Sequence, residues 1–260
     1  MNIRTIIKNS ILWFGSLLHR NHASKILFYH DICGSTSYKS LDSDVLMGTP
    51  LELFKKHLEV IAEEGYKIVP RITQPENEVA IMLDDGFRGI WDNREFFYEQ
   101  GICPTVFLAV ELIGKEGFLT ESEIQELQSH GFIFECHSWS HTNLAMKTDA
   151  ELQRELGEAR SYLSQLLGKD VRELCLPVGY FSDHLIELAR AYGYTEIYSS
   201  IPGNYFSPVA CGLRARNLCQ FAAPQEVKYI LRGGPELIRM RYEQMHHLPN
   251  FLGEAYKPII

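Results

Sequence analysis

The chain has 260 residues, which suits one large α/β domain or two small ones, and its 45% hydrophobic and 22% charged residues are typical of a folded protein. Its formal net charge of −8 argues against nucleic acid as a partner, because phosphate binding needs a basic face. The six cysteines show no CxxC spacing and several lie in apolar runs, which favours a reducing compartment.

Residues 1–24 predict an amphipathic helical segment that precedes the main domain. The apolar residues that would share one helical face are Ile3, Ile7, Ile11, Phe14 and Leu18. The segment contains basic residues and no acidic one, its apolar stretch 11–18 is too short to span a bilayer, and no clear signal-peptide cleavage site follows. Three interpretations stay open: a helix docked on the protein's own core, a basic helix on an anionic membrane surface through residues 1–20, and an atypical export signal.

Strands and helices are expected to alternate from residue 25 onward. The expected strands cover residues 25–30, 78–83, 104–110, 132–137, 171–177 and 194–199. The expected helices begin at Thr49, near Phe87, at the capping boxes of Thr120 and Thr148, at Ser182 and at Pro224. Continuous apolar strands in this alternation predict a parallel sheet covered by helices. We therefore expect residues 25–260 to form a single-domain α/β fold, a distorted (β/α) barrel of seven or eight parallel strands (TIM-like), with a doubly wound open sheet as the alternative.

Polar side chains stand at the expected C-terminal ends of these strands, where the functional sites of both folds lie. They are His30, Asp84, Asp85, His137 and, four residues further on, His141. Two imidazoles and one carboxylate suit a borderline divalent metal and leave coordination positions open. The second aspartate would stand beside this metal and accept a proton from water. Each motif alone is a weak signal, but their joint placement at strand ends predicts a metal site.

These residues resemble the polysaccharide deacetylases, the NodB-homology group of carbohydrate esterase family 4. Residues 82–86 (MLDDG) are similar to the first family motif, and residues 137–141 (HSWSH) match the second. Residues 104–108 (PTVFL) look like a family strand, and residues 176–180 (LPVGY) are similar to the turn of the third motif. Residues 28–32 (FYHDI) resemble the opening of the biofilm poly-glucosamine deacetylase subgroup. The resemblance extends over most of the chain.

The resemblance implies a divalent metal ion, most commonly Zn²⁺, on Asp85, His137 and His141, with Asp84 as the general base. It implies hydrolysis of an acetamide on an N-acetylated sugar of a surface polysaccharide or its precursor, which releases acetate and a free amine. The partner would be an N-acetylated oligo- or polysaccharide or a lipid-linked precursor. The backbone N–H of Val178 would help to stabilise the oxyanion.

Other positions are candidates for the sugar groove or depart from the family pattern. Pro177, Tyr180 and Trp139 are expected to line the groove, with packing as the alternative for Trp139 and coverage of the barrel mouth as the alternative for Tyr180. Cys175 stands where many members carry an arginine that braces the catalytic aspartate.

The general acid has no matching histidine late in the chain. His30 and His184 are positional candidates for it, whereas His246 and His247 lie in an expected helix and match poorly. Arg214 and Arg216 are expected to be solvated or paired with local acids, with contact to an anionic substrate group as the alternative.

Two other functions stay open on the sequence. One is a hydrolase of another amide or cyclic ureide on the same metal site, and the other is a non-catalytic carbohydrate-binding relative, which the missing general acid and the arginine-to-cysteine change would favour. We expect a cytoplasmic protein, with peripheral attachment to the inner membrane and export as the alternatives.

Overall fold

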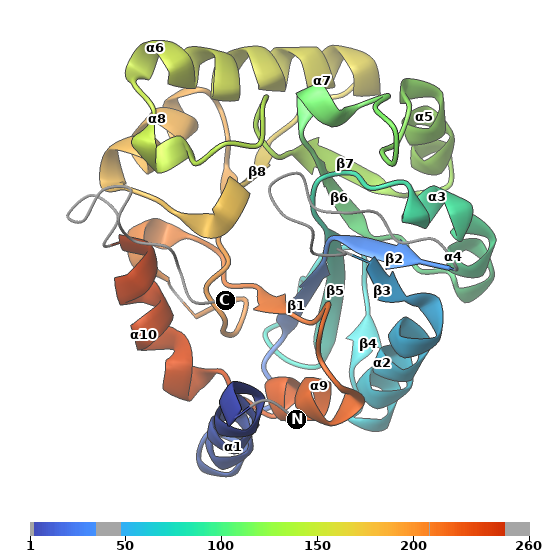
Figure 1. Ribbon diagram of the computed structural model, residues 1–260, viewed down its shortest axis with the longest axis vertical. Coiled ribbons are helices and arrows are strands. Elements are labelled where there is room, and N and C mark those ends of the chain that lie inside the picture. Colours follow the sequence, from blue (N-terminus) through green and yellow to red (C-terminus); the bar gives the residue numbers. More distant parts are fainter. Residues whose placement is uncertain (1–2, 35–47, 208, 248–260) are drawn as a thin grey trace.

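A curled sheet surrounded by helices forms the body of the protein (Figure 1), which is described by a computed structural model for residues 3–34, 48–207 and 209–247. The strands of this sheet are β1 (Lys25–Tyr29), β4 (Lys67–Ile68), β5 (Glu78–Leu83), β6 (Thr105–Leu108), β7 (Ile133–Cys136), β8 (Glu173–Cys175), β9 (Glu196–Tyr198) and β10 (Asn217–Leu218). Their order is β10-β1-β5-β6-β7-β8-β9, with β4 on β5, and every pairing is parallel. The fold is therefore the expected distorted (β/α) barrel.

The segment 214–219 joins the two ends of the curled sheet. The Arg214 N–H donates to the Ile197 carbonyl of β9 at 2.9 Å, and the Cys219 N–H donates to the Phe28 carbonyl of β1 at 3.0 Å. One short stretch of chain thus hydrogen-bonds to both edge strands, and it closes the barrel.

Helices cover the outside of this barrel (Figure 1). They are α1 (Ile3–Leu18), α2 (Leu51–Glu63), α3 (Gly89–Asp92), α4 (Arg94–Gln100), α5 (Glu121–Ser129), α6 (Asp149–Leu152), α7 (Ala159–Leu167), α8 (Asp183–Ala191), α9 (Pro224–Leu231) and α10 (Glu236–His247). The two predicted capping boxes, at Thr120 and Thr148, are present. A π-helical segment, Gln153–Glu158, connects α6 to α7, so the single helix predicted here contains a locally wider turn.

Three details differ from the sequence prediction. The helix predicted from residue 87 to 100 is divided at Asn93, which has a non-helical backbone conformation (φ −109°, ψ 16°) and whose side-chain Nδ2 donates to the carbonyls of Ile32 and Gly89. The helix predicted to begin at Thr49 begins instead at Leu51, because Thr49 lies in β3 (Gly48–Pro50). That strand pairs with β2 (Asp31–Cys33) in a small second sheet, which the sequence did not predict.

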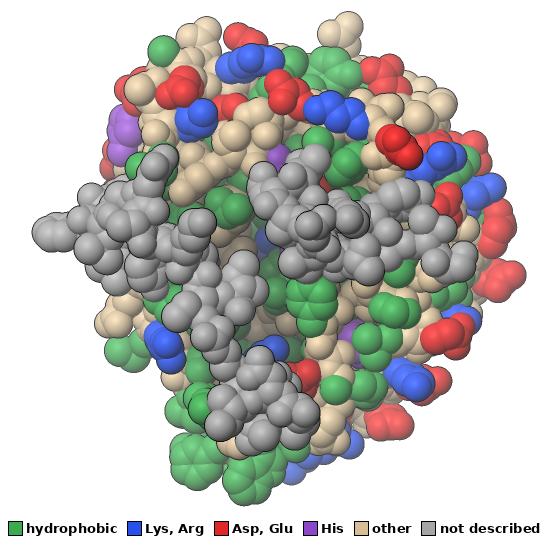
Figure 2. Space-filling model, in the orientation of Figure 1, with side chains coloured by type: hydrophobic (Ala, Val, Ile, Leu, Met, Phe, Trp, Pro, Cys, Tyr) green, Lys and Arg blue, Asp and Glu red, His purple; other side chains and the backbone are tan. Residues whose placement is uncertain are grey.

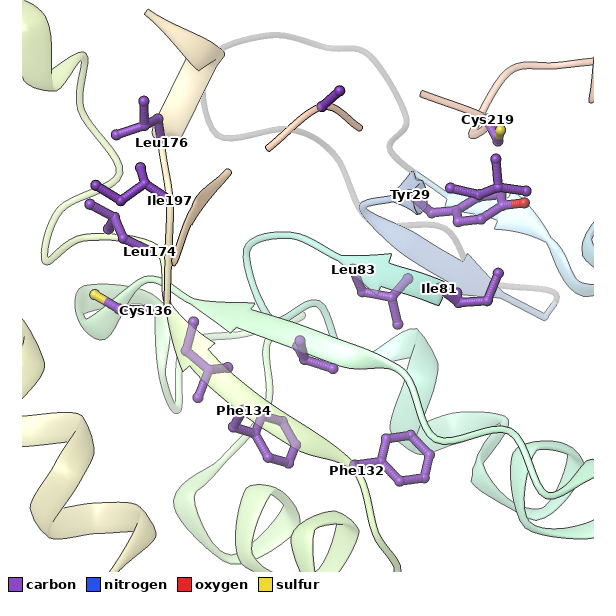
Figure 3. Close-up of a cluster of buried hydrophobic side chains, with 14 of the residues drawn as sticks. Tyr29, Ile81, Leu83, Phe132, Phe134, Cys136, Leu174, Leu176, Ile197 and Cys219 are labelled. Carbon is purple, nitrogen blue, oxygen red and sulfur yellow. The ribbon is translucent and has the colours of Figure 1, made fainter. Parts of the chain in front are cut away.

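The strands bury both faces, and the two faces have different roles. Alternate residues such as Ile81, Leu83 and Phe134 pack toward the helices in the larger apolar cluster (Figure 3). The residues between them, such as Ala80 and Met82 on β5, fill the barrel interior. Because side chains alternate along a strand, Asp84 continues the interior row at the C-terminal end of β5. The same pattern extends the interior row of β1 to His30.

Helix α1 packs on α9 and α10 through a narrow face. Its buried residues there are Leu12, Gly15 and Ser16, and a Cβ on Gly15 would lie 2.4 Å from the Gly234 carbonyl oxygen. Ile7, Phe14 and Leu18 of the apolar face predicted from the sequence are exposed, so the described contact with the core uses other residues of the helix. Within the described residues, none of the helices combines the length and hydropathy that a bilayer-crossing segment needs.

Candidate metal and catalytic site

Three potential metal ligands converge at the C-terminal rim of the barrel. Asp85 follows β5, His137 follows β7, and His141 lies in the loop after β7. Asp85 Oδ1 lies 3.2 Å from His137 Nε2 and 3.0 Å from His141 Nε2. One ligand atom from each residue lies within 4.8 Å of the other two. The three side chains that the sequence predicted to share a metal are therefore brought together.

The chemistry of these donor atoms fits a cation. His137 Nδ1–H donates to the Cys175 carbonyl at 2.8 Å, so Nε2 carries the lone pair that faces Asp85. Within the described part of the chain, the buried Asp85 Oδ1 receives no hydrogen bond of acceptable geometry. Lone pairs that face each other in this way are stabilised by a positive ion between them.

The neighbouring aspartate, Asp84, is held by an arginine that is completely buried. Arg216 donates from Nη1 to Asp84 Oδ1 at 2.7 Å and from Nη2 to Oδ2 at 2.8 Å, and its Nε donates to the Ser199 carbonyl. Burial alone would raise the pKa of Asp84, but the guanidinium outweighs burial and lowers it. A carboxylate oxygen of Asp84 also lies within 4.8 Å of a ring nitrogen of His137. An ionised carboxylate that is not one of the three converging ligands thus stands beside the metal site.

Arg216 is the site residue whose role the sequence did not identify. It was expected to be solvated or paired with a local acid, and its partner is instead Asp84, which is 132 residues away in sequence. The Cys175 Sγ lies 3.7 Å from Asp84 Oδ2, so the small cysteine side chain and the guanidinium share the space around this carboxylate. A long side chain from the barrel-closing segment therefore braces the aspartate where the family pattern places an arginine at position 175.

Backbone strain concentrates at this site. Among the described residues, six that are not glycine have a positive φ, and four of them lie at the rim: Asp85 (71°), Ser138 (68°), His141 (56°) and Val178 (53°). A β-branched residue such as Val178 rarely adopts this conformation, which persists only where the surrounding structure imposes it. In the described structure the Val178 N–H makes no hydrogen bond, and the side chain is half exposed. The third-motif turn thus presents an available backbone donor.

His30 lies at the rim with its ring orientation fixed. Gln220 Oε1 accepts from the His30 backbone N–H at 3.2 Å and contacts Nδ1. Because a carbonyl oxygen can only accept, Nδ1 carries the proton of a neutral ring and Nε2 is the basic atom. The Asp84 N–H donates to the Tyr29 carbonyl at 3.0 Å, so His30 and Asp84 follow paired positions of two neighbouring strands.

The predicted groove residues have different surroundings. Trp139 packs edge-on against Tyr162, Arg154 lies over its ring face at 4.9 Å, and its Nε1–H donates to Glu111. Pro177 is buried in the third-motif turn, and Tyr180 follows the turn with its ring against His246. The contacts of Trp139 are therefore packing contacts with neighbouring side chains of the protein.

The remaining candidates lie in three different environments. His184 is exposed on α8, and its Nε2 is 2.7 Å from Asp149. Arg214 pairs with Glu196, with Nε–Oε2 at 2.6 Å, on the barrel-closing segment. His246 lies beside the third-motif turn, where a Cβ on Gly179 would be 3.2 Å from its ring, and burial lowers its pKa. His246, which matched the family poorly by sequence, is thus nearer to the turn than expected.

A buried carboxylate fixes the loop that carries His141. Glu155, in the π-helical segment, accepts from the N–H groups of Trp139 and Ser140 at 3.1 and 3.0 Å and from Ser140 Oγ at 2.5 Å. Nothing in the motif itself indicates this residue, because the contact depends on the wider turn of the helix. Glu155 therefore holds the loop that leads to His141, a proposed metal ligand, through Trp139 and Ser140.

Replacing Glu155 by Gln is expected to weaken metal binding by about 10- to 100-fold, the usual effect of losing a residue that orients metal ligands. An amide has one acceptor oxygen where the carboxylate has two, so one side of the loop loses its partner. A competition titration with a chromogenic chelator measures the dissociation constant of the metal. Glu158→Gln, on the exposed side of the same segment, is the matched control. An unchanged dissociation constant with a lower melting temperature would show that Glu155 acts on stability alone.

The curled parallel sheet with an Asp-His-His cluster at its rim defines a (β/α)-barrel protein with a candidate metal site. Residues 71–197 match the sequence model of the polysaccharide deacetylase family. Over this stretch the chain is similar to the polysaccharide deacetylase family.

Individual relatives agree with this assignment. The protein YxkH of Bacillus subtilis (strain 168) is 26% identical over 192 residues, which are 68% of this chain and 64% of YxkH. The chain therefore spans less than two thirds of that relative. Among solved structures, the Streptococcus pyogenes deacetylase PplD has a TM-score of 0.67 at 17% identity and covers 80% of this chain and 98% of its own. IcaB from Ammonifex degensii has a TM-score of 0.65 at 16% identity, and the match covers 82% of this chain and 98% of IcaB. At these identities the two structures support the fold.

Proposed function

We propose that the protein is a metal-dependent hydrolase that removes the acetyl group from an N-acetylated sugar of a surface polysaccharide or of its lipid-linked precursor. The observation that carries the proposal is the convergence of Asp85, His137 and His141 beside the buried Asp84–Arg216 pair. The match of residues 71–197 to the polysaccharide deacetylase family model supports an acetylated carbohydrate as the substrate. The related PplD was solved in complex with acetate, the product that this reaction would release.

Zn²⁺ is the metal that we propose for the site, because two imidazoles and one carboxylate with open positions are typical ligands of catalytic zinc. Bound by these three residues, it would act as a Lewis acid toward the acetyl carbonyl and toward water.

The chain's own residues would supply the proton transfers and part of the charge stabilisation. Asp84 is ionised and would accept the proton of the attacking water, since the two Arg216 hydrogen bonds leave one lone pair on each carboxylate oxygen. The Val178 N–H would donate to the oxyanion that develops on the carbonyl oxygen. His30, anchored through Nδ1, would in its protonated imidazolium form transfer the Nε2 proton to the departing amine and become neutral.

Purified protein is expected to release acetate from N-acetylglucosamine oligomers, to lose this activity with a chelator, and to recover it when Zn²⁺ is added back. An enzyme-coupled acetate assay together with elemental analysis of the protein measures both properties. If metal-replete protein leaves these oligomers intact but hydrolyses another amide or a cyclic ureide, that compound class would be assigned as the substrate instead of an N-acetylated sugar. Protein that binds the oligomers and retains no metal would contradict the enzymatic proposal.

A further inference from the structure

Helix α1 exposes a broad apolar face to solvent. Five of its large apolar residues are between 49% and 60% exposed: Ile7, Trp13, Phe14, Leu17 and Leu18. Figure 2 shows hydrophobic side chains gathered at the lower edge of the molecule, where Figure 1 places α1. Neighbouring α10 adds the exposed Met240. A contiguous apolar patch of this kind marks an interaction site rather than ordinary surface.

The packing of α1 explains why this face is free for another role. The helix is held to the protein by Leu12, Gly15 and Ser16, and the close approach of Gly15 to the Gly234 carbonyl fixes its position. The exposed residues lie outside this narrow contact. Exposing five large apolar side chains adds nothing to the stability of the fold, so their presence on one face calls for a partner.

The charge around the helix identifies the chemistry of that partner. The chain carries 33 acidic residues, and the first of them is Asp31, so the segment that contains α1 has none. Arg20 is exposed just after the helix, and Lys8 is about half exposed although it reaches Glu226 at 3.5 Å. The segment is therefore basic in a chain whose net charge is −8. An apolar face bordered by cations complements a lipid surface with anionic headgroups.

We propose that α1 lies in the plane of an anionic membrane surface, with the exposed face inserted among the acyl chains and the barrel attached alongside. This proposal is independent of the proposed catalytic function. It corresponds to the peripheral attachment through residues 1–20 that the sequence left open, and it would bring the barrel close to a lipid-linked or membrane-adjacent substrate.

The test is co-sedimentation of the full-length protein with vesicles of 70% phosphatidylcholine and 30% phosphatidylglycerol, compared with vesicles of phosphatidylcholine alone. We expect binding to the anionic vesicles, a blue shift of Trp13 fluorescence, and weaker binding when the salt concentration is raised. The variant Phe14→Ser/Leu17→Ser/Leu18→Ser should bind more than about 100-fold less tightly, because three large apolar side chains no longer enter the bilayer. It should keep its fold, because the substituted side chains are exposed.

Phe206→Ser, at a similarly exposed phenylalanine outside α1, is the matched control and should bind like the wild type. Equal binding of the triple variant and the wild type would overturn the proposal. Equal binding to both kinds of vesicle would overturn the electrostatic part of it. Absence of vesicle binding, with a wild-type dimer in analytical ultracentrifugation that the triple variant loses, would assign the face to a second copy of the chain instead.

Discussion

Asp84→Asn is expected to lower kcat for the proposed deacetylation by about 10²- to 10⁴-fold while the protein keeps its metal, because the variant loses the proposed general base and none of the three proposed metal ligands. An amide at position 84 cannot accept the proton of water at neutral pH. The measurement is acetate release at saturating substrate, with the metal content determined on the same sample.

Asp85→Asn provides the contrast, since it removes one of the three converging ligand atoms and should lose metal and activity together. The pair of variants separates the two adjacent carboxylates by role. Loss of metal from Asp84→Asn, or retention of metal by Asp85→Asn, would reverse the assignment of these roles.

Arg216→Met is expected to lower the free energy of unfolding by about 3–5 kcal/mol, because it leaves the buried Asp84 carboxylate without its partner. The same reasoning applies to Asp84→Asn, which leaves Arg216 unpaired. The double variant removes both charges and should therefore be more stable than the sum of the two single effects predicts. Urea denaturation of the four proteins measures this coupling.

Arg214→Met is the matched control for Arg216→Met. Its partner Glu196 lies in a partly exposed pair, and such pairs contribute about 0–1 kcal/mol. Equal losses for the two arginine variants would show that the Asp84–Arg216 pair has no special energetic role.

The stability difference between the wild type and Arg216→Met should also depend on pH. The pKa of Asp84 is lowered in the folded wild type, so its contribution to stability is present above the ordinary carboxyl pKa and is lost as the pH falls through the lowered value. Without Arg216, Asp84 loses the main influence that lowers its pKa, while burial continues to raise it. The difference in the free energy of unfolding between the wild type and Arg216→Met should thus be largest near neutral pH and should become smaller under acidic conditions. A difference that is constant with pH would exclude Asp84 ionisation as its source.

The strands and the residues at their ends were predictable because their signals are local. Apolar runs gave six strands of the barrel but not the two-residue strands β4 and β10, and the capping boxes at Thr120 and Thr148 gave two helix starts. The polar residues after the runs gave Asp84, Asp85, His137 and His141. The parallel arrangement of the strands then placed these side chains on one rim of the barrel.

Arg216 and Glu155 could not be predicted because their roles depend on contacts across the fold. Arg216 reaches Asp84 from the segment that closes the barrel, and it lies beyond residue 197, where the family match ends. Glu155 reaches the His141 loop through a π-helical turn that the capping pattern does not indicate. The exposure of the apolar residues of α1 could not be predicted either. The sequence shows which residues share one face of the helix, but not which face packs on the protein.

The closing segment has a consequence for biosynthesis. A nascent chain that has emerged only as far as residue 200 already contains both aspartates and both histidines, yet it lacks the guanidinium that keeps Asp84 ionised in the folded protein. In the folded barrel, burial favours the protonated acid and the guanidinium opposes it, so Asp84 becomes both buried and ionised only when the closing segment has docked. Closure of the barrel and the charge of the proposed proton acceptor are therefore linked through one side chain.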